Sequence, residues 1–189
     1  MQYCTECLFP AVAATPLTFD QHGVCSGCRA GRHKRTIDWT KRRALFGGLV
    51  EKYRNPDGYD CVLPVSGGKD SYFAAHVARE FGLKALMVTY HGNNYLPEGE
   101  RNLMRMKDVF GFDHIIFRPS TDILRRLNRL GFTLTGDMNW HAHAGIFTYP
   151  MQMAVLHNIP LVFWGDHGFT EQGGMHSHDA FFEYTAEDR

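Results

Sequence analysis

Residues 66–71 have the composition of a loop that binds a phosphate group. Their sequence is Ser-Gly-Gly-Lys-Asp-Ser, and the two glycines let the backbone approach an anion closely. The hydroxyls of Ser66 and Ser71 can donate hydrogen bonds to phosphate oxygens, and Lys69 supplies a positive charge. Asp70 would repel a phosphate unless a magnesium ion lies between them, so its presence indicates magnesium. The alternative is a glycine turn that only caps the helix after it.

Four of the five cysteines form two Cys-x-x-Cys pairs, a pattern typical of a structural zinc site. Cys4 and Cys7 make the first pair, and Cys25 and Cys28 make the second. Four thiolates match the tetrahedral geometry of zinc and leave no coordination position for a substrate. We therefore predict a zinc ion that holds a small N-terminal knuckle together, with redox-active pairs as the alternative. Cys61 lies in an apolar run and is predicted to pack in the core.

The C-terminal part of the chain is rich in histidine and supplies further candidate residues. Six of the eleven histidines lie between His141 and His178. His141 and His143 come just before a predicted helix, where they can transfer protons near neutral pH or pack against the helix start. Asp166 follows a predicted strand, where it can bind a metal ion or orient a substrate. His167 and Glu171 are similar candidates, whereas His176 and His178 are interpreted as solvated loop residues.

The overall composition narrows the class of protein. The 189 residues are 44% hydrophobic, which suits one α/β domain with a small appendage. Lys plus Arg equals Asp plus Glu at 20 each, and this balance argues against nucleic acid as the main partner. The start lacks the pattern of a signal peptide, and no apolar run approaches the ~18 residues that cross a membrane. We expect a cytoplasmic protein that does not associate with membranes.

Apolar runs alternate with helical periodicity, which predicts an α/β fold with a mostly parallel sheet and helices on both faces. The predicted strands cover residues 61–65, 85–90, 114–117 and 160–164. The predicted helices cover residues 70–81, 98–110, 121–130 and 146–157. Ligands of such sheets bind at the carboxyl ends of the strands. The predicted domains are a zinc-binding knuckle (1–31), a helical linker (32–58) and an ATP-binding α/β domain (59–189).

Residues 66–71 resemble the SGGxDS signature of the PP-loop ATP pyrophosphatases. The resemblance implies a Rossmann-like fold of the HUP type, which binds ATP with magnesium and splits it into AMP and pyrophosphate. The nucleotide-binding residues that it implies are Ser66, Gly67, Gly68, Lys69, Asp70, Ser71, Thr89 and Gly165.

Within this superfamily, the sequence is similar to the N-acetyl sugar amidotransferases of bacterial surface-polysaccharide synthesis. The similarity is carried by the two cysteine pairs and by residues 136–143, 164–167 and 171–174. It implies that an N-acetyl group of a sugar becomes an acetamidino group, with ammonia from a glutamine amidotransferase partner. The catalytic residues that the similarity implies are Lys69, Asp70, Asp166, His141 and His143.

Two departures from the family pattern and two alternatives bear on this interpretation. Asp166-His167 and Glu171-Gln172 stand where the family has Glu-Asn or Glu-Asp and then Glu-Tyr-Gly-Gly. Family members are commonly longer, so we expect this chain to carry the nucleotide-binding half.

One alternative is a tRNA-thiolation enzyme with the same loop, which needs a reactive cysteine or an iron–sulfur cluster. The other is a module that binds a nucleotide or a partner without turnover.

Overall fold

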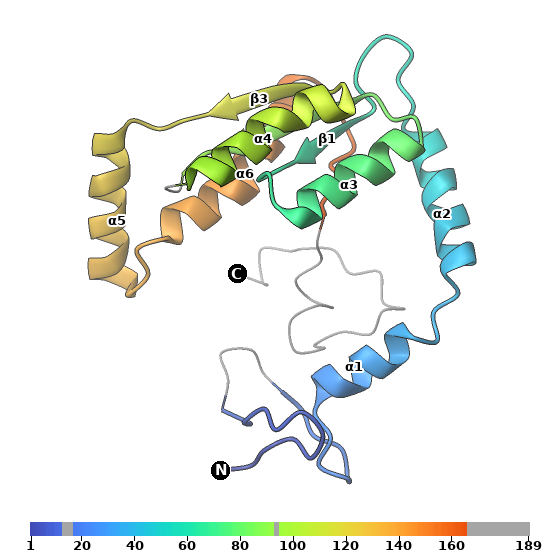
Figure 1. Cartoon of the computed structure of the whole chain (residues 1–189), viewed down its shortest axis with the longest axis vertical. Coiled ribbons are helices and arrows are strands. Elements are labelled where there is room, and N and C mark those ends of the chain that lie inside the picture. The colour runs from blue at the N-terminus through green and yellow to red at the C-terminus, as the bar shows by residue number, and fades with distance from the viewer. Residues whose placement is uncertain (13–16, 93–94, 166–189) are drawn as a thin grey trace. The chain divides into compact units, whose positions relative to one another are not determined.

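The computed structural model describes residues 1–12, 17–92 and 95–165 (Figure 1). The described chain contains two compact units, residues 1–42 and residues 43–165. The division falls within a helix, α2, which spans Trp39–Lys52. None of the described helices is long and apolar enough to cross a membrane.

The first unit is built around the cysteines. Antiparallel bridges join Tyr3 to Pro10 and Phe19 to Cys25. Helix α1, Ser26–Lys34, starts directly after Cys25, whose sulfur accepts a hydrogen bond from the N–H of Cys28 (3.4 Å). A small core of buried side chains holds this unit together and consists of Cys4, Val24 and Cys25.

Where the sequence predicts a helical linker at residues 32–58, the structure has the end of α1 and the whole of α2. Local side-chain hydrogen bonds end the first helix and start the second. The hydroxyl of Thr36 donates to the carbonyl of His33 (2.8 Å), which closes α1. The carboxylate of Asp38 accepts from the N–H of Lys41 (2.9 Å), which caps the start of α2.

The second unit contains a three-stranded parallel sheet in the order β1-β2-β3. The strands are β1 (Cys61–Pro64), β2 (Ala85–Tyr90) and β3 (Asp113–Phe117). The connections are helices α3 (Lys69–Glu80) and α4 (Pro97–Phe110). These five elements confirm the β-α-β-α-β order that the sequence predicts.

The fourth predicted strand, residues 160–164, is reduced to a single bridge. Val162 pairs in parallel with Val62 of β1, through two backbone hydrogen bonds of 2.9 Å that the N–H groups of Val62 and Phe163 donate. The segment therefore lies beside β1 at the edge of the sheet without forming a regular strand.

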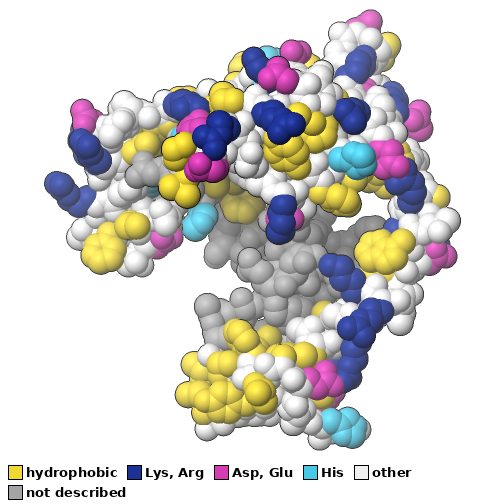
Figure 2. Space-filling model, viewed as in Figure 1, with side chains coloured by type: hydrophobic (Ala, Val, Ile, Leu, Met, Phe, Trp, Pro, Cys, Tyr) yellow, Lys and Arg dark blue, Asp and Glu magenta, His cyan; other side chains and the backbone are white. Residues whose placement is uncertain are grey.

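Alternate residues of each strand pack on opposite faces of the sheet. Cys61 and Met87 belong to one core, which they share with Leu103 of α4. Val62 belongs to the other core, with Ala154 of α6 (Trp140–Leu156). Figure 1 shows α3 and α4 on one face and α6 on the other. Over α3 and α4, Figure 2 shows Lys and Arg side chains interspersed with Asp and Glu.

Two helices near the C-terminal end of the described chain differ from their predicted bounds. Helix α5 spans Thr121–Thr135 and continues through Gly131, where the sequence predicted its end. A Cβ on Gly131 would lie 2.6 Å from the carbonyl oxygen of Asp137, so this glycine permits close packing. The helix ends instead at Gly136, whose φ is +74°. Helix α6 begins at Trp140 and not at residue 146, with Pro150 buried inside it.

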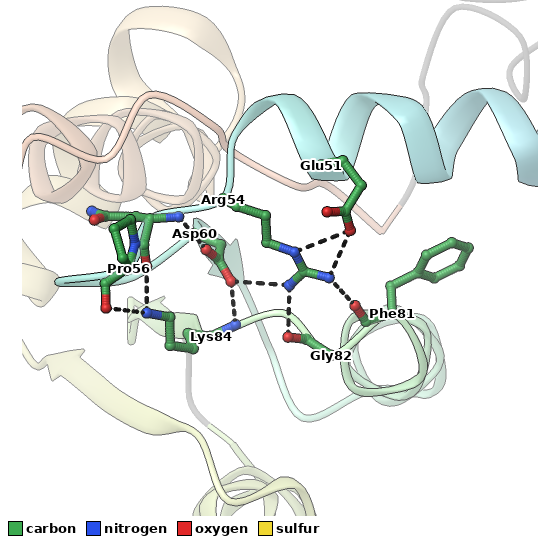
Figure 3. Close-up of polar contacts among 8 residues, drawn as sticks. Glu51, Arg54, Pro56, Asp60, Phe81, Gly82 and Lys84 are labelled. Carbon is green, nitrogen blue, oxygen red and sulfur yellow. Dashed lines mark hydrogen bonds and ion pairs between the residues drawn. The ribbon is translucent and has the colours of Figure 1, made fainter.

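A buried carboxylate fixes the amino end of the sheet (Figure 3). Asp60 precedes β1, is fully buried, and accepts hydrogen bonds from the N–H groups of Asn55 and Lys84 (both 2.7 Å). Its second oxygen also pairs with Arg54 (3.3 Å), which donates to the carbonyl of Gly82 (2.7 Å). One carboxylate thus joins the chain after α2, the start of β1 and the turn between α3 and β2.

Burial opposes ionisation of Asp60, but its hydrogen bonds outweigh that cost. The N–H groups of Lys84 and Asn55 and the guanidinium of Arg54 all stabilise the charged form, so the pKa of Asp60 is lowered.

The substitution Asp60→Asn is expected to destabilise the chain by roughly 2–4 kcal/mol. One of the two backbone N–H groups would then face an amide nitrogen, and Arg54 would lose its charged buried partner. Urea unfolding followed by tryptophan fluorescence measures the loss. The control is Glu51→Gln, which removes an exposed partner of the same arginine and is expected to cost less than about 1 kcal/mol.

Comparison of the wild type with Asp60→Asn tests the sign of the pH effect on stability. Because the folded-state pKa lies below the unfolded value of about 3.9, Asp60 contributes stability above that pH. The contribution is lost as the pH falls through the folded-state pKa. Stability should therefore fall more steeply with acid in the wild type than in Asp60→Asn, and parallel curves would contradict the assignment.

Candidate phosphate-binding site and metal centre

The predicted phosphate loop lies at the carboxyl end of β1, immediately before α3. Two serines close it: the N–H of Ser66 donates to the hydroxyl of Ser71 (2.8 Å), and the two hydroxyl oxygens lie 3.2 Å apart. Gly68 is the residue that precedes α3, and it supplies no side-chain cap. The first N–H groups of α3 therefore receive no side-chain cap from Gly68. Uncapped N–H groups at the start of a helix commonly bind anions in proteins.

Gly67 allows α4 to pack directly against the loop. Its φ is +79°, and a Cβ there would lie 2.8 Å from the backbone nitrogen of Leu103. Gly165 also lies beside the loop, because a Cβ there would be 3.2 Å from the carbonyl oxygen of Asp70. The structure thus brings Gly67, Gly165 and the first turn of α3 together, as the sequence-based site requires.

Lys69 and Asp70 occupy the first turn of α3 and are exposed. The lysine Nζ lies 2.6 Å from a carboxylate oxygen of Asp70. Asp70 offers a carboxylate at the helix start, which fits a magnesium ion that takes its other ligands from phosphate and water. Both residues are therefore accessible to a nucleotide.

Thr89 fixes the backbone directly before the loop. Its buried hydroxyl donates to the carbonyl of Val65 (2.6 Å), the residue before the loop. Burial lowers the pKa of His114 to about 4, so this histidine is neutral at physiological pH. Since the only hydroxyl hydrogen of Thr89 is already used, His114 Nε2 must donate to the Thr89 oxygen (2.9 Å). The Thr89 side chain therefore positions the end of β1.

Three residues that the sequence-based analysis did not select form a polar cluster at the ends of β2 and β3. His91 follows β2, Arg118 follows β3, and Glu100 lies in the first turn of α4. One oxygen of Glu100 contacts His91 Nε2, and the other accepts from Arg118 Nη2 (2.7 Å). Their positions directly after strands are the sequence signal that could have identified His91 and Arg118.

His141 and His143 lie inside the first turn of α6, whereas the sequence analysis placed them just before a helix. His141 is buried, and burial lowers its pKa. With its amide nitrogen turned toward the imidazole, Asn128 of α5 donates to His141 Nε2 and to the carbonyl of Met138 (3.0 Å). His141 therefore joins α5 to α6.

His143 is exposed, and its Nδ1 lies 3.8 Å from Asp137. Among the described residues, no hydrogen bond or ion pair joins either of these histidines to the phosphate loop. The remaining candidates lie outside the described residues: Asp166, His167, Glu171, His176 and His178.

The four paired cysteines form one cluster, with all their Sγ atoms within 4.8 Å of one another. The Sγ atoms of Cys4 and Cys28 lie 3.9 Å apart, and those of Cys7 and Cys25 lie 3.7 Å apart. A tetrahedron with zinc–sulfur bonds of about 2.3 Å has edges of about 3.8 Å, so the cluster fits zinc. The N–H groups of Glu6 and Cys25 donate to Cys4 Sγ (3.4 and 3.3 Å), which stabilises a thiolate there.

The ionisation of the cluster depends on a compensating positive charge. The backbone N–H of Cys7 lowers the pKa of the Cys4 thiol to about 6, whereas burial raises the pKa of Cys28 to about 12. Cys28 therefore becomes a thiolate at neutral pH only when a positive charge compensates it. Cys61, in contrast, is buried in β1, as predicted, and burial raises its pKa to about 12.

Comparisons with known proteins find a similarity in fold but none in sequence. No protein-family model matches the chain, and no curated protein matches it in sequence. Its structure is similar to that of the NH3-dependent NAD synthetase from Campylobacter jejuni subsp. jejuni NCTC 11168, in complex with the nitrate ion, at 15% identity and a TM-score of 0.53. The likeness covers 75% of this chain and 62% of the synthetase chain, so this chain spans less than two thirds of its length. The fold is thus the Rossmann-like α/β fold of the HUP type.

The cysteine cluster predicts about one zinc ion per chain. Cys7→Ser is expected to abolish stoichiometric zinc binding and to lower the stability of the N-terminal unit, because three thiolates leave the tetrahedron incomplete. Metal analysis of the purified protein by mass spectrometry measures the content. Cys61→Ala is the control that removes the fifth cysteine, and it should keep its zinc. Equal zinc contents in both variants would contradict the site.

Gly67→Ala is expected to destabilise the chain by more than about 2 kcal/mol, because the added methyl group meets the α4 backbone. Gly111→Ala provides the matched control: its φ of +70° is similar, but nothing lies within 4 Å of the new methyl group. The control should cost only the backbone strain of about 1 kcal/mol. Urea unfolding measures both, and equal losses would show that α4 does not pack against the loop.

Proposed function

We propose that the chain binds ATP at the loop of residues 66–71 and splits it into AMP and pyrophosphate. The observation that carries the proposal is the glycine loop between β1 and α3, with Gly67 against α4 and the helix start open to an anion. Ser66, Ser71 and Lys69 would then hold the pyrophosphate. A magnesium ion at Asp70 would neutralise charge on the phosphate oxygens.

The proposed reaction activates an amide oxygen. The oxygen attacks the α-phosphorus of ATP, the bond from this phosphorus to the bridging oxygen breaks, and pyrophosphate leaves. Ammonia then attacks the activated carbon, and the carbon–oxygen bond to AMP breaks, which yields an amidine and a proton. Lys69 would stabilise the negative charge that develops on the phosphoryl oxygens.

We further propose that the amide is an N-acetyl group of a bacterial surface-polysaccharide sugar. The support is the resemblance of short motifs described above, together with a cysteine cluster that fits the zinc site of that family. A fold shared with a synthetase whose name states that it depends on NH3 is compatible with ammonia as the nitrogen source. The ammonia would come from a glutamine amidotransferase partner.

The arrangement of the cysteines argues against sulfur transfer to tRNA. Four of them form the cluster whose spacing fits a zinc ion, which would occupy their thiolates, and Cys61 is buried with a raised pKa. Sulfur transfer needs an accessible thiolate or an iron–sulfur cluster near the nucleotide. The neutral net charge argues in the same direction.

The test is the release of AMP and pyrophosphate from ATP with magnesium, ammonium and a panel of N-acetylated nucleotide sugars. AMP that depends on one sugar would support the proposal and identify the substrate. ATP binding without AMP under every condition would favour a binding module. AMP formation that depends on tRNA would favour the thiolation alternative.

Lys69→Ala is expected to lower pyrophosphate release at least about 100-fold, because the loop loses its mobile positive charge. Zinc content should stay unchanged, and an unchanged urea unfolding transition separates this effect from unfolding of the unit that carries the loop. Lys41→Ala removes an exposed lysine elsewhere and should retain full turnover. Turnover that survives in Lys69→Ala would show that the loop is assigned wrongly.

A further inference from the structure

The cluster of His91, Glu100 and Arg118 has the features of a built site. It joins three elements, because His91 follows β2, Glu100 lies in α4 and Arg118 follows β3. Glu100 Oε1 contacts His91 Nε2, and Arg118 reaches both carboxylate oxygens at 2.7 and 3.4 Å. The side chains of His91 and Glu100 are 11% and 30% exposed, so the contact is unlike an isolated surface ion pair.

The cluster lies next to the phosphate loop. Leu103, whose backbone contacts Gly67, is one helical turn after Glu100 on α4. On the other side, His91 follows Thr89 by two residues, and Thr89 binds the carbonyl of Val65 directly before the loop. Both connections place the cluster at the carboxyl edge of the sheet, where ligands of this class of fold bind.

Arg118 is the group of the cluster that can bind an anionic ligand. The hydrogen bond from Arg118, with a further one from His91, outweighs burial and lowers the pKa of Glu100, so its carboxylate is ionised. An unpaired carboxylate beside a phosphate site would repel the ligand, but Arg118 neutralises it. The guanidinium of Arg118 carries five N–H groups and remains 49% exposed, so donors are left for a second partner.

We propose that Arg118 binds an anionic phosphate group at this edge of the sheet, and that Glu100 and His91 are positioning residues that hold its guanidinium in place. The inference rests on the proposed function of the neighbouring loop. The phosphate belongs either to ATP or to the nucleotide-linked acceptor, since both carry the chemistry that a fixed guanidinium recognises.

The experiment measures binding of inorganic pyrophosphate, ATP and adenosine to the full chain by titration calorimetry with magnesium present. Arg118→Gln is expected to weaken binding of pyrophosphate and ATP about 10-fold or more, and to leave adenosine binding unchanged. Arg118→Lys should restore only part of the affinity, because a lysine lacks the fork of donors. The matched control is Arg101→Gln, which removes an exposed arginine paired with Glu98 on the same helix.

The substitution Glu100→Gln tests whether Glu100 positions the guanidinium of Arg118 or only neutralises its charge. A positioning role predicts weaker pyrophosphate binding, because the guanidinium loses its charged anchor. Stronger binding would show that Glu100 only offsets the charge of Arg118, and it would overturn the positioning role. Thermal unfolding of each variant shows whether the fold is kept.

The outcomes distinguish the source of the phosphate and the level at which the idea fails. Losses for pyrophosphate and ATP assign the contact to the nucleotide. A loss seen only as a raised KM for the nucleotide-linked acceptor assigns it to that substrate. Unchanged binding of pyrophosphate and ATP in Arg118→Gln, together with an unchanged KM for the nucleotide-linked acceptor, overturns the inference and leaves the proposed function intact. A wild-type chain that binds pyrophosphate but forms no AMP overturns the proposed function alone, and one that binds neither pyrophosphate nor ATP overturns both.

Discussion

Parallel pairing of β1, β2 and β3 is the constraint on which the rest of the second unit depends. Because the strands run in one direction, their carboxyl ends lie together at one end of the sheet, and the phosphate loop, His91 and Arg118 all follow strand ends there. The amino end of the sheet is fixed by Asp60, a buried charge whose hydrogen bonds come from the chain before β1 and the chain before β2. The amino end of the sheet is thus held by the contacts of Asp60, and the carboxyl end carries the candidate phosphate site.

Close packing around the loop limits which residues the site can use. Gly67 must be a glycine because α4 passes against it, and Thr89 cannot offer its hydroxyl hydrogen to a ligand because Val65 already accepts it. The exposed charged side chains there include those of Lys69, Asp70 and Arg118. The candidate site therefore combines a rigid backbone cradle with a few mobile or half-exposed charges.

The cysteine cluster and the phosphate loop belong to different units and perform different physical tasks. The knuckle has a core of only a few apolar side chains, too small to hold its turns by burial alone. A metal ion bound by the four sulfurs, which lie at the corners of a metal-sized tetrahedron, would supply the missing cross-links. The second unit has two larger cores and needs no such support.

The sequence by itself determined the features that depend on local signals. The glycine loop between an apolar run and a periodic segment, the cysteine spacing, and the bounds of β2 follow from neighbouring residues alone. Only the tertiary structure decided features that depend on distant partners. Gly131 looked like a helix end but serves close packing against Asp137, and the contact of His141 with Asn128 joins two helices that the sequence does not pair. The partnership of His91, Glu100 and Arg118 was likewise hidden, because contacts between separate elements leave no periodic pattern in the sequence.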